Sequence, residues 1–195
     1  MGVLALQGDV REHLAALDSI EVEAVPVRTA DEVGAVDGLV LPGGESTTMS
    51  RLLRIFNLED PLRERLDGGM PTLSTCAGAI LLGREILDGR LDQRPFGALD
   101  ITTRRNAYGR QINSFETQLA IATIGAPTFP AVFIRAPIIS AVGDDVDVLA
   151  SYGGSPVMVR HGDHLLLTFH PELTGDARIH RLFAQTVRAR REAAA

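Results

Sequence analysis

The stretch that decides the fold runs from Pro71 to Leu82 and reads PTLSTCAGAILL. Its first half is a short run typical of a buried strand, and its second half has the small and aliphatic residues of a buried helix. One cysteine, Cys76, stands at the junction. We therefore predict a strand over roughly Met70 to Ser74, a tight turn at Cys76, and a helix that opens over Ala77 to Leu82.

The same alternation of strand and helix patterns extends through the first half of the chain. Strands are predicted at Val3–Leu6, Glu21–Val27 and Gly38–Leu41. Helical faces follow the first and third of them, formed by Val10, Leu14 and Leu17 and by Met49, Leu52, Leu53 and Phe56, with Ser46, Thr47 and Thr48 expected to cap the second helix. This alternation is typical of a parallel sheet with helices on both faces.

The second half is richer in strand patterns. They lie at Leu99–Thr103, Thr117–Thr123, Ala131–Ile134, Val146–Ala150, Val157–Arg160 and Leu165–Phe169. A last amphipathic helix is predicted over about Asp176 to Arg191. Because no repeat or Pro/Gly-rich linker divides the chain, we expect one α/β domain over residues 1–195.

Composition narrows the functional class. The 195 residues are 45% apolar and 23% charged, with a net charge of −6, which is ordinary for a soluble globular protein. An acidic balance argues against nucleic acid and anionic membranes as partners. One cysteine excludes an internal disulfide and a multi-cysteine metal site. With no signal-peptide pattern and no apolar run of about 18 residues, we expect a cytoplasmic protein.

Cys76 lies where a nucleophile would stand at the end of a strand. A strand–turn–helix junction with small neighbours is the layout of a nucleophile elbow. The helix N-terminus favours the thiolate, and the N–H of Ala77 is the natural donor to an oxyanion. The alternative is a buried structural cysteine. Glycine usually stands two residues before the nucleophile, and Ser74 occupies that position, so closure of the turn is left open.

His170 and Glu172 follow the last apolar strand, two residues apart. Residues i and i+2 of an extended segment point to the same side, and Pro171 biases His170 toward extended conformations. Glu172 is therefore expected to orient the imidazole as the third member of a triad. The alternative is a structural hydrogen bond at a strand end.

The other histidines are not assigned to chemistry. His13 and His180 are expected on the surfaces of helices, and His161 and His164 on an exposed hairpin around Gly162-Asp163. No metal site is predicted, because no pair has the spacing of a metal motif.

A second turn at a strand end is Leu41 to Ser46, which reads LPGGES. Its flexible backbone is suited to aim the N–H of Gly44 at the same oxyanion. A simple connector and a phosphate-binding loop are the alternatives. The second is disfavoured because no Gly-Lys-Ser/Thr follows and Glu45 would repel an anion.

Together these motifs resemble the class I, or triad-type, glutamine amidotransferases. Within that class they are similar to the family of glutaminase subunits of pyridoxal 5′-phosphate synthase. The motifs in order are Gly2–His13, Leu41–Thr48, Thr75–Gly78, Arg104–Gln111, Ser114–Glu116, Phe133–Pro137 and Phe169–Thr174. They run over nearly the whole chain.

The resemblance implies a flavodoxin-like α/β glutaminase fold that needs no cofactor. It implies hydrolysis of glutamine and transfer of the ammonia to a separate barrel-shaped synthase subunit in a hetero-oligomer, which makes pyridoxal 5′-phosphate from a pentose phosphate and a triose phosphate. The implied catalytic residues are Cys76, His170 and Glu172, with oxyanion donors at Gly44 and Ala77. The implied glutamine-binding residues are Gly44, Glu45, Ser46, Arg105, Ile134 and Arg135.

Two other functions are compatible with the residues alone. One is a γ-glutamyl peptidase or another cysteine hydrolase that acts without a partner. The other is a non-catalytic binding module, against which the intact Cys76, His170 and Glu172 argue. Under the glutaminase interpretation, the isolated chain is expected to be slow until a partner docking near Gly43-Gly44 sets that turn.

Overall fold

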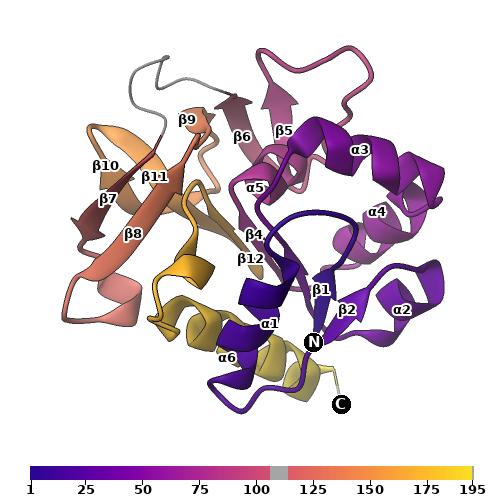
Figure 1. Cartoon of the computed structure of the whole chain (residues 1–195), viewed down its shortest axis with the longest axis horizontal. Helices are drawn as coiled ribbons and strands as arrows, with labels where there is room; N and C mark the ends of the chain where they lie inside the picture. Colours follow the sequence, from indigo (N-terminus) through magenta and orange to yellow (C-terminus); the bar gives the residue numbers. More distant parts are fainter. Residues whose placement is uncertain (106–113, 195) are drawn as a thin grey trace.

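The structure is a computed structural model, and it describes residues 1–105 and 114–194. Of the sequence motif Arg104–Gln111, residues 106–111 lie outside the described residues. Figure 1 shows a central sheet with helices packed on both of its faces and two smaller sheets beside it.

In the described part of the chain the central sheet has seven strands in the order β10-β11-β12-β4-β3-β1-β2. They are β1 (Gly2–Leu4), β2 (Val25–Val27), β3 (Leu39–Leu41), β4 (Thr72–Thr75), β10 (Asp147–Tyr152), β11 (Ser155–His161) and β12 (His164–Leu167). The five from β12 to β2 are parallel, whereas β10, β11 and β12 pair antiparallel. The expected mostly parallel α/β sheet is confirmed.

The helices lie between the strands and after the last one. They are α1 (Val10–Asp18), α2 (Ala30–Ala35), α3 (Ser46–Ile55), α4 (Glu59–Asp67), α5 (Ala77–Leu82) and α6 (Arg178–Ala193), with short 3₁₀ turns η1 (Ala122–Ile124) and η2 (Pro171–Leu173). Among the described residues, no helix has both the length and the hydropathy required to cross a bilayer.

Alternating strand residues bury their side chains on opposite faces of the sheet. Leu4 and Leu166 pack in one apolar cluster with α2, α3, α4 and α5. Their neighbours Val3 and Leu165 pack in the other cluster with α1 and α6. A strand buried on both faces reads as a continuous apolar run, which is why β12 appears in the sequence as three consecutive leucines.

Two smaller sheets flank the centre. One is β5 (Gly83–Ile86), β6 (Leu99–Arg104) and β9 (Ile138–Val142), and the other is the hairpin of β7 (Ser114–Leu119) and β8 (Phe129–Ile134). The hairpin matters for function, because the N–H of His170 donates to the carbonyl of Val132 in β8 at 2.8 Å. This bond ties the residue after the central sheet to the strand that ends at Ile134.

The structure differs from the sequence prediction at several elements. The strand expected at Glu21–Val27 contains only Val25–Val27, and the one expected at Thr117–Thr123 ends at Leu119. The short elements α2, α4, β5 and β9 had no prediction. The segments of α2 and β5 carry few apolar residues, whereas Leu62 and Leu66 of α4 and the apolar run of β9 offered a pattern that the prediction missed.

Candidate active site

The carboxyl ends of four neighbouring parallel strands meet at one edge of the central sheet. The loops after β12, β4, β3 and β1 lie there side by side. Together with the end of β8 they border a cavity of about 350 Å³, which is lined by Gln7, Asp9, Gly44, Glu45, Cys76, Ile134, Arg135 and His170. Ligands of open α/β sheets bind at this end of the strands, so the cavity is the candidate active site.

Cys76 occupies a strained turn between β4 and α5. Its φ is 46° and its ψ is −100°, a conformation that costs energy for a residue with a side chain. The Cys76 N–H donates to the carbonyl of Leu167 at 2.9 Å. The turn therefore closes as a nucleophile elbow. Ser74 is accommodated inside β4, fully buried and in register with Leu41 and Leu166.

The Cys76 sulfur is 3.8 Å from the carbonyl oxygen of Ile134, its hydrogen-bond acceptor. His170 lines the same cavity. Its Nε2 has no hydrogen-bond partner among residues 1–105 and 114–194. A buried nitrogen with nothing to bind is poised for a new partner, and the Cys76 sulfur or a substrate atom in the cavity could fill that position.

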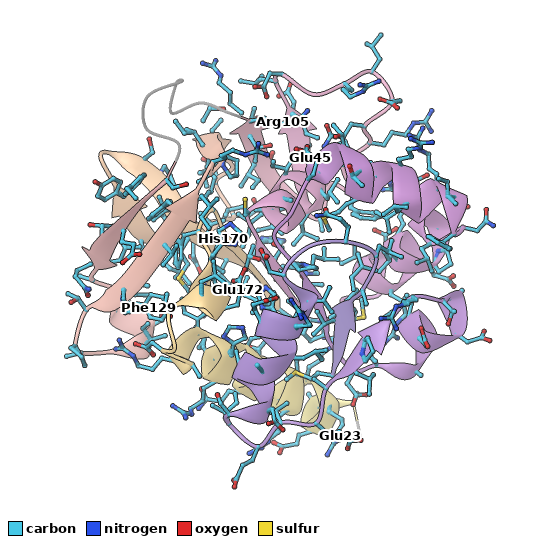
Figure 2. All side chains as sticks on the ribbon, viewed as in Figure 1. Glu23, Glu45, Arg105, Phe129, His170 and Glu172 are labelled. Carbon is cyan, nitrogen blue, oxygen red and sulfur yellow. The ribbon has the colours of Figure 1, made fainter. Side chains whose placement is uncertain are left out.

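His170 is oriented by Glu172, as expected from the sequence. His170 Nδ1 and Glu172 Oε1 are 2.8 Å apart, and the Glu172 side chain is fully buried. Figure 2 shows the two side chains together near the middle of the molecule. The predicted reason was wrong, because Glu172 lies in the 3₁₀ turn η2 and not on an extended segment.

A second carboxylate was missed by the sequence prediction. Asp9 Oδ2 lies 3.2 Å from the same His170 Nδ1. Burial lowers the pKa of His170, but its contacts with Asp9, Cys76 and Glu172 outweigh burial and raise that pKa above its ordinary value. The hydrogen bond with His170 in turn lowers the pKa of Asp9. An imidazolium in this position places a positive charge next to Cys76.

Three side chains at this place each offer one atom that could ligate a metal ion, and these atoms lie within 4.8 Å of one another. They belong to Asp9, His170 and Glu172. The short bonds from His170 Nδ1 to both carboxylates account for the same spacing through a shared proton. The cluster fits an acid–base role without further partners.

The glycine turn after β3 lies against this histidine. A side chain at Gly43 would collide with the His170 ring, and one at Gly44 would collide with Gln7. Gly44 also has a φ of 150°, which favours glycine. Gln7 accepts a hydrogen bond from the N–H of Glu45 at 2.8 Å, so this missed residue fixes the turn.

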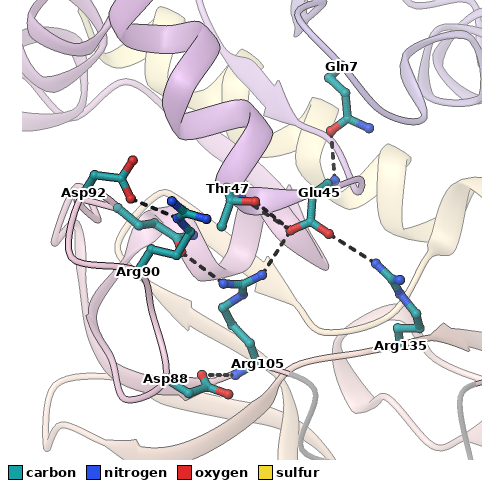
Figure 3. A network of polar contacts seen from close by, with 9 residues as sticks. Gln7, Glu45, Thr47, Asp88, Arg90, Asp92, Arg105 and Arg135 are labelled. Atoms are coloured by element: carbon teal, nitrogen blue, oxygen red, sulfur yellow. Dashed lines mark hydrogen bonds and ion pairs between the residues drawn. The ribbon is translucent and has the colours of Figure 1, made fainter. Parts of the chain in front are cut away.

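Glu45 connects two arginines at the cavity mouth (Figure 3). Its carboxylate is 3.0 Å from the Arg105 guanidinium and 3.2 Å from that of Arg135. Glu45 also caps α3 by accepting from the N–H of Thr47 at 3.5 Å. The cap predicted at Ser46 to Thr48 is thus one residue earlier.

The remaining predicted residues lie around the cavity. Ser46 is buried in the first turn of α3, and Ala77 is buried as the first residue of α5. The structure brings Gly44, Glu45, Cys76, Ile134, Arg135 and His170 to one cavity. Arg105 reaches it through Glu45.

The predictions for three other histidines were wrong. His13 and His180 are completely buried, and they contact each other directly behind the candidate triad. His164 is also buried and bonds Thr72 at 2.8 Å. The hairpin expected around Gly162 is present between β11 and β12. His13 stands three residues after Val10 and four before Leu17, so its place on the apolar face was the available signal.

Known proteins match the whole chain. The pyridoxal 5′-phosphate synthase subunit PdxT of Mycobacteroides abscessus is 59% identical over 97% of each chain. The subunit of the same name from Parafrankia is 54% identical over 97% of this chain and 93% of its own. A solved structure described as a glutamine amidotransferase superposes with a TM-score of 0.89 at 45% identity, covering 95% of this chain and 97% of that one.

The model of one protein family matches residues 3–189, which is almost the full length of the chain. A more distant structure, that of PurLQS from Thermotoga maritima, has a TM-score of 0.65 at 16% identity, covers 94% of this chain and 96% of that one, and shares the fold. The strained cysteine, the histidine–glutamate pair and the full-length matches agree: the chain belongs to the SNO glutamine amidotransferase family.

Proposed function

We propose that this chain is the glutaminase component of a pyridoxal 5′-phosphate synthase. It hydrolyses L-glutamine to L-glutamate and ammonia and supplies the ammonia to a synthase subunit. The observation that carries the proposal is a strained Cys76 sharing one cavity with a buried His170–Glu172 pair. Relatives bearing the synthase-subunit name match over 97% of the chain.

The chemistry proceeds in two acyl-transfer steps. The Cys76 thiolate attacks the side-chain amide carbon of glutamine, and His170 Nε2 gives its proton to the departing ammonia. The γ-glutamyl thioester is then attacked by water, and His170 takes the proton of that water as the C–S bond breaks. The thiolate–imidazolium pair is restored, and the new γ-carboxylic acid loses its proton to water as glutamate leaves, so glutamine and water become glutamate, ammonia and a proton.

Glu172 keeps the His170 ring oriented throughout, because its buried carboxylate accepts from Nδ1 and leaves Nε2 directed to the reacting atoms. Asp9 adds a second negative group at the same nitrogen. The two carboxylates favour the imidazolium that the first step requires.

Two backbone N–H groups are proposed as the oxyanion hole. Ala77 opens α5, where the first N–H groups have no acceptor within the helix. Gly44 lines the cavity in a conformation suited to glycine. Loss of one such donor costs about 10²–10³ in rate, so the setting of the Gly44 turn is a point at which a partner could control activity.

The ends of the glutamine main chain are proposed to bind at the mouth of the cavity. Both arginines bond Glu45, but Arg135 lines the cavity with a side chain that is 61% exposed, whereas the side chain of Arg105 is only 16% exposed. We therefore assign the substrate carboxylate to Arg135 and the substrate ammonium to Glu45. Arg105 then holds Glu45 in place, and Ser46 and Ile134 border the site.

The partner is proposed to be a barrel-type synthase subunit in a hetero-oligomer. Ammonia is neutral and small, and it escapes into water unless the acceptor protein covers the cavity. The surface next to the Gly43-Gly44 turn, where the Arg135 side chain is exposed, is the proposed docking face. We place the complex in the cytoplasm and treat residues 1–195 as one domain without a bound cofactor.

The test is release of ammonia from glutamine, measured with and without the synthase subunit of the same organism. We expect strong stimulation by the synthase and complete loss of activity in Cys76→Ala, with an unchanged thermal unfolding midpoint. Equal activity without the synthase, together with cleavage of γ-glutamyl peptides, would identify a solitary hydrolase. Substantial turnover by Cys76→Ala would refute the assignment of the nucleophile.

A further inference from the structure

A second polar cluster lies directly behind Glu172, in the interior between α1 and α6. His13 Nδ1 is 3.0 Å from His180 Nε2, and His13 Nε2 is 3.2 Å from the hydroxyl of Thr75. His13 Nε2 is also 3.4 Å from Glu172 Oε2. His13, Thr75 and His180 are all completely buried. The chain of contacts thus extends from the candidate triad to the C-terminal helix.

The two carboxylate oxygens of Glu172 have unequal surroundings. Oε1 is paired with His170 at 2.8 Å. Oε2 is buried and has no hydrogen bond among the described residues, and it faces His13 Nε2. A buried polar atom left without a donor destabilises the folded state. His13 is the residue in position to supply a donor to Oε2.

The positions of the protons follow from counting donors and acceptors. Burial lowers the pKa of both His13 and His180, so each ring is neutral and carries one N–H. If His13 carries its proton on Nε2, that N–H faces Glu172 and Thr75. His13 Nδ1 is then an acceptor, and His180 Nε2–H donates to it. The lone pair of His180 Nδ1 is then left without a partner in the described chain.

The opposite tautomer leaves Glu172 Oε2 without a donor. With the proton on His13 Nδ1, the Thr75 hydroxyl could donate to Nε2, but no N–H would face the Glu172 carboxylate, and His180 would have to accept at Nε2. The His180 proton would then sit on the buried Nδ1 without an acceptor. A buried N–H without a partner is rarer and more costly than an unfilled acceptor. The first arrangement is therefore the stable one.

We propose that His13 is a positioning residue for glutamine hydrolysis: its Nε2–H holds Glu172 Oε2 and the Thr75 hydroxyl, and His180 fixes its tautomer. The inference rests on the proposed function, because positioning has meaning only if the triad is catalytic. His13 thereby couples the orienter to the nucleophile, since Thr75 directly precedes Cys76.

Substitution of His13 tests the position of the donor. A glutamine side chain places an N–H near the site of imidazole Nε2, whereas asparagine reaches only to Nδ1 and leucine offers no donor. With the synthase present, we expect His13→Leu and His13→Asn to lower kcat about 10–100-fold, as lost outer partners of active groups do. KM should change little, and His13→Gln should recover most of kcat. Equal losses in all three variants would overturn the proposal.

A double-mutant cycle separates positioning from a general loss of packing. If His13 acts through Glu172, His13→Leu should change kcat less than about 3-fold when Glu172 is already Gln. If His13 supports only the stability of the fold, its effect on kcat should be the same in both backgrounds. That second result would contradict the proposal.

The tautomer can be read in the unmodified chain by ¹⁵N NMR of its five histidines, assigned with single His→Gln variants. We expect His13 and His180 both in the Nε2–H form. A proton on His13 Nδ1 would overturn the inference, whether or not the protein hydrolyses glutamine. Conversely, a wild-type protein that is inactive with its synthase would refute the proposed function. The NMR spectrum would still show whether His13 and His180 carry their protons on Nε2.

Discussion

Three buried histidines lie close together in the interior, but they differ in charge: His170 is protonated, whereas His13 and His180 are neutral. His170 is 4% exposed and lies between two carboxylates, whereas His13 and His180 are completely buried and contact each other. Burial acts on all three in the same direction by penalising the charged form. Only the anions of Asp9 and Glu172, with Cys76, outweigh it at His170. The neighbours, and not the depth, decide which histidine is charged.

This difference matches what each group must do. The imidazolium of His170 is the acid that releases ammonia in the proposed reaction. The neutral rings of His13 and His180 can direct single protons without adding a competing positive charge near Glu172. Exchanging the two charge states would leave Glu172 with a positive charge behind it and an uncharged base in front.

The largest expected effect comes from removing the charge of Glu172. Glu172→Gln keeps the shape of the side chain but offers His170 no anion, and it can present an N–H to Nδ1. The ring would then take the wrong tautomer, and we expect kcat to fall about 10³–10⁴-fold, by analogy with the aspartate of serine proteases. Steady-state ammonia release with the synthase measures it. A loss of less than about 10-fold would mean that Glu172 does not orient the base.

The neutral pair should make the fold sensitive to acid. Burial lowers the pKa of His180 to about 4 from 6.5. A depressed pKa means that the unfolded chain binds the proton first, so stability is present above pH 6.5 and is lost as pH falls toward 4. The loss is about 3 kcal/mol at about 1.36 kcal/mol per pKa unit. Urea unfolding at about pH 7 and about pH 4.5 measures it.

The control is His180→Gln, which keeps a donor for His13 but does not titrate. Its unfolding free energy should fall less than that of the wild type between the two pH values. An equal fall in both proteins would mean that His180 is not held neutral by burial.

A smaller effect is expected from Asp9, because it is the more exposed of the two carboxylates at His170. Asp9→Asn should lower kcat about 10-fold, which corresponds to loss of one hydrogen bond to a charged group. It should also lower the pKa of His170, so the alkaline limb of the kcat/KM profile should move to lower pH. If the alkaline limb does not move, Glu172 and not Asp9 keeps His170 charged.

The sequence was informative wherever neighbours in the chain became neighbours in space. The run PTLSTCAGAILL predicted β4, the turn and α5, and the pair His170 and Glu172 is two residues apart. Asp9 and His13 escaped prediction, because their partners His170 and His180 lie near the other end of the chain. The partners of such side chains depend on strand order, which local patterns do not encode.

One error had a readable cause. His13 and His180 were assigned to helix surfaces by residue type, although both stand on apolar faces, His180 between Ile179 and Phe183. A polar residue on an apolar face signals a buried network. The position of the α3 cap was set by Glu45, whose long side chain also serves two arginines.

The most direct test of the account is covalent labelling of the nucleophile by a glutamine analogue that carries an electrophilic diazo ketone. We predict one label per chain, on Cys76, and a loss of glutamine hydrolysis in proportion to labelling. Excess glutamine should slow both the labelling and the loss of activity. Glutaminase activity that persists when Cys76 is fully labelled, or inactivation through another residue, would contradict the account.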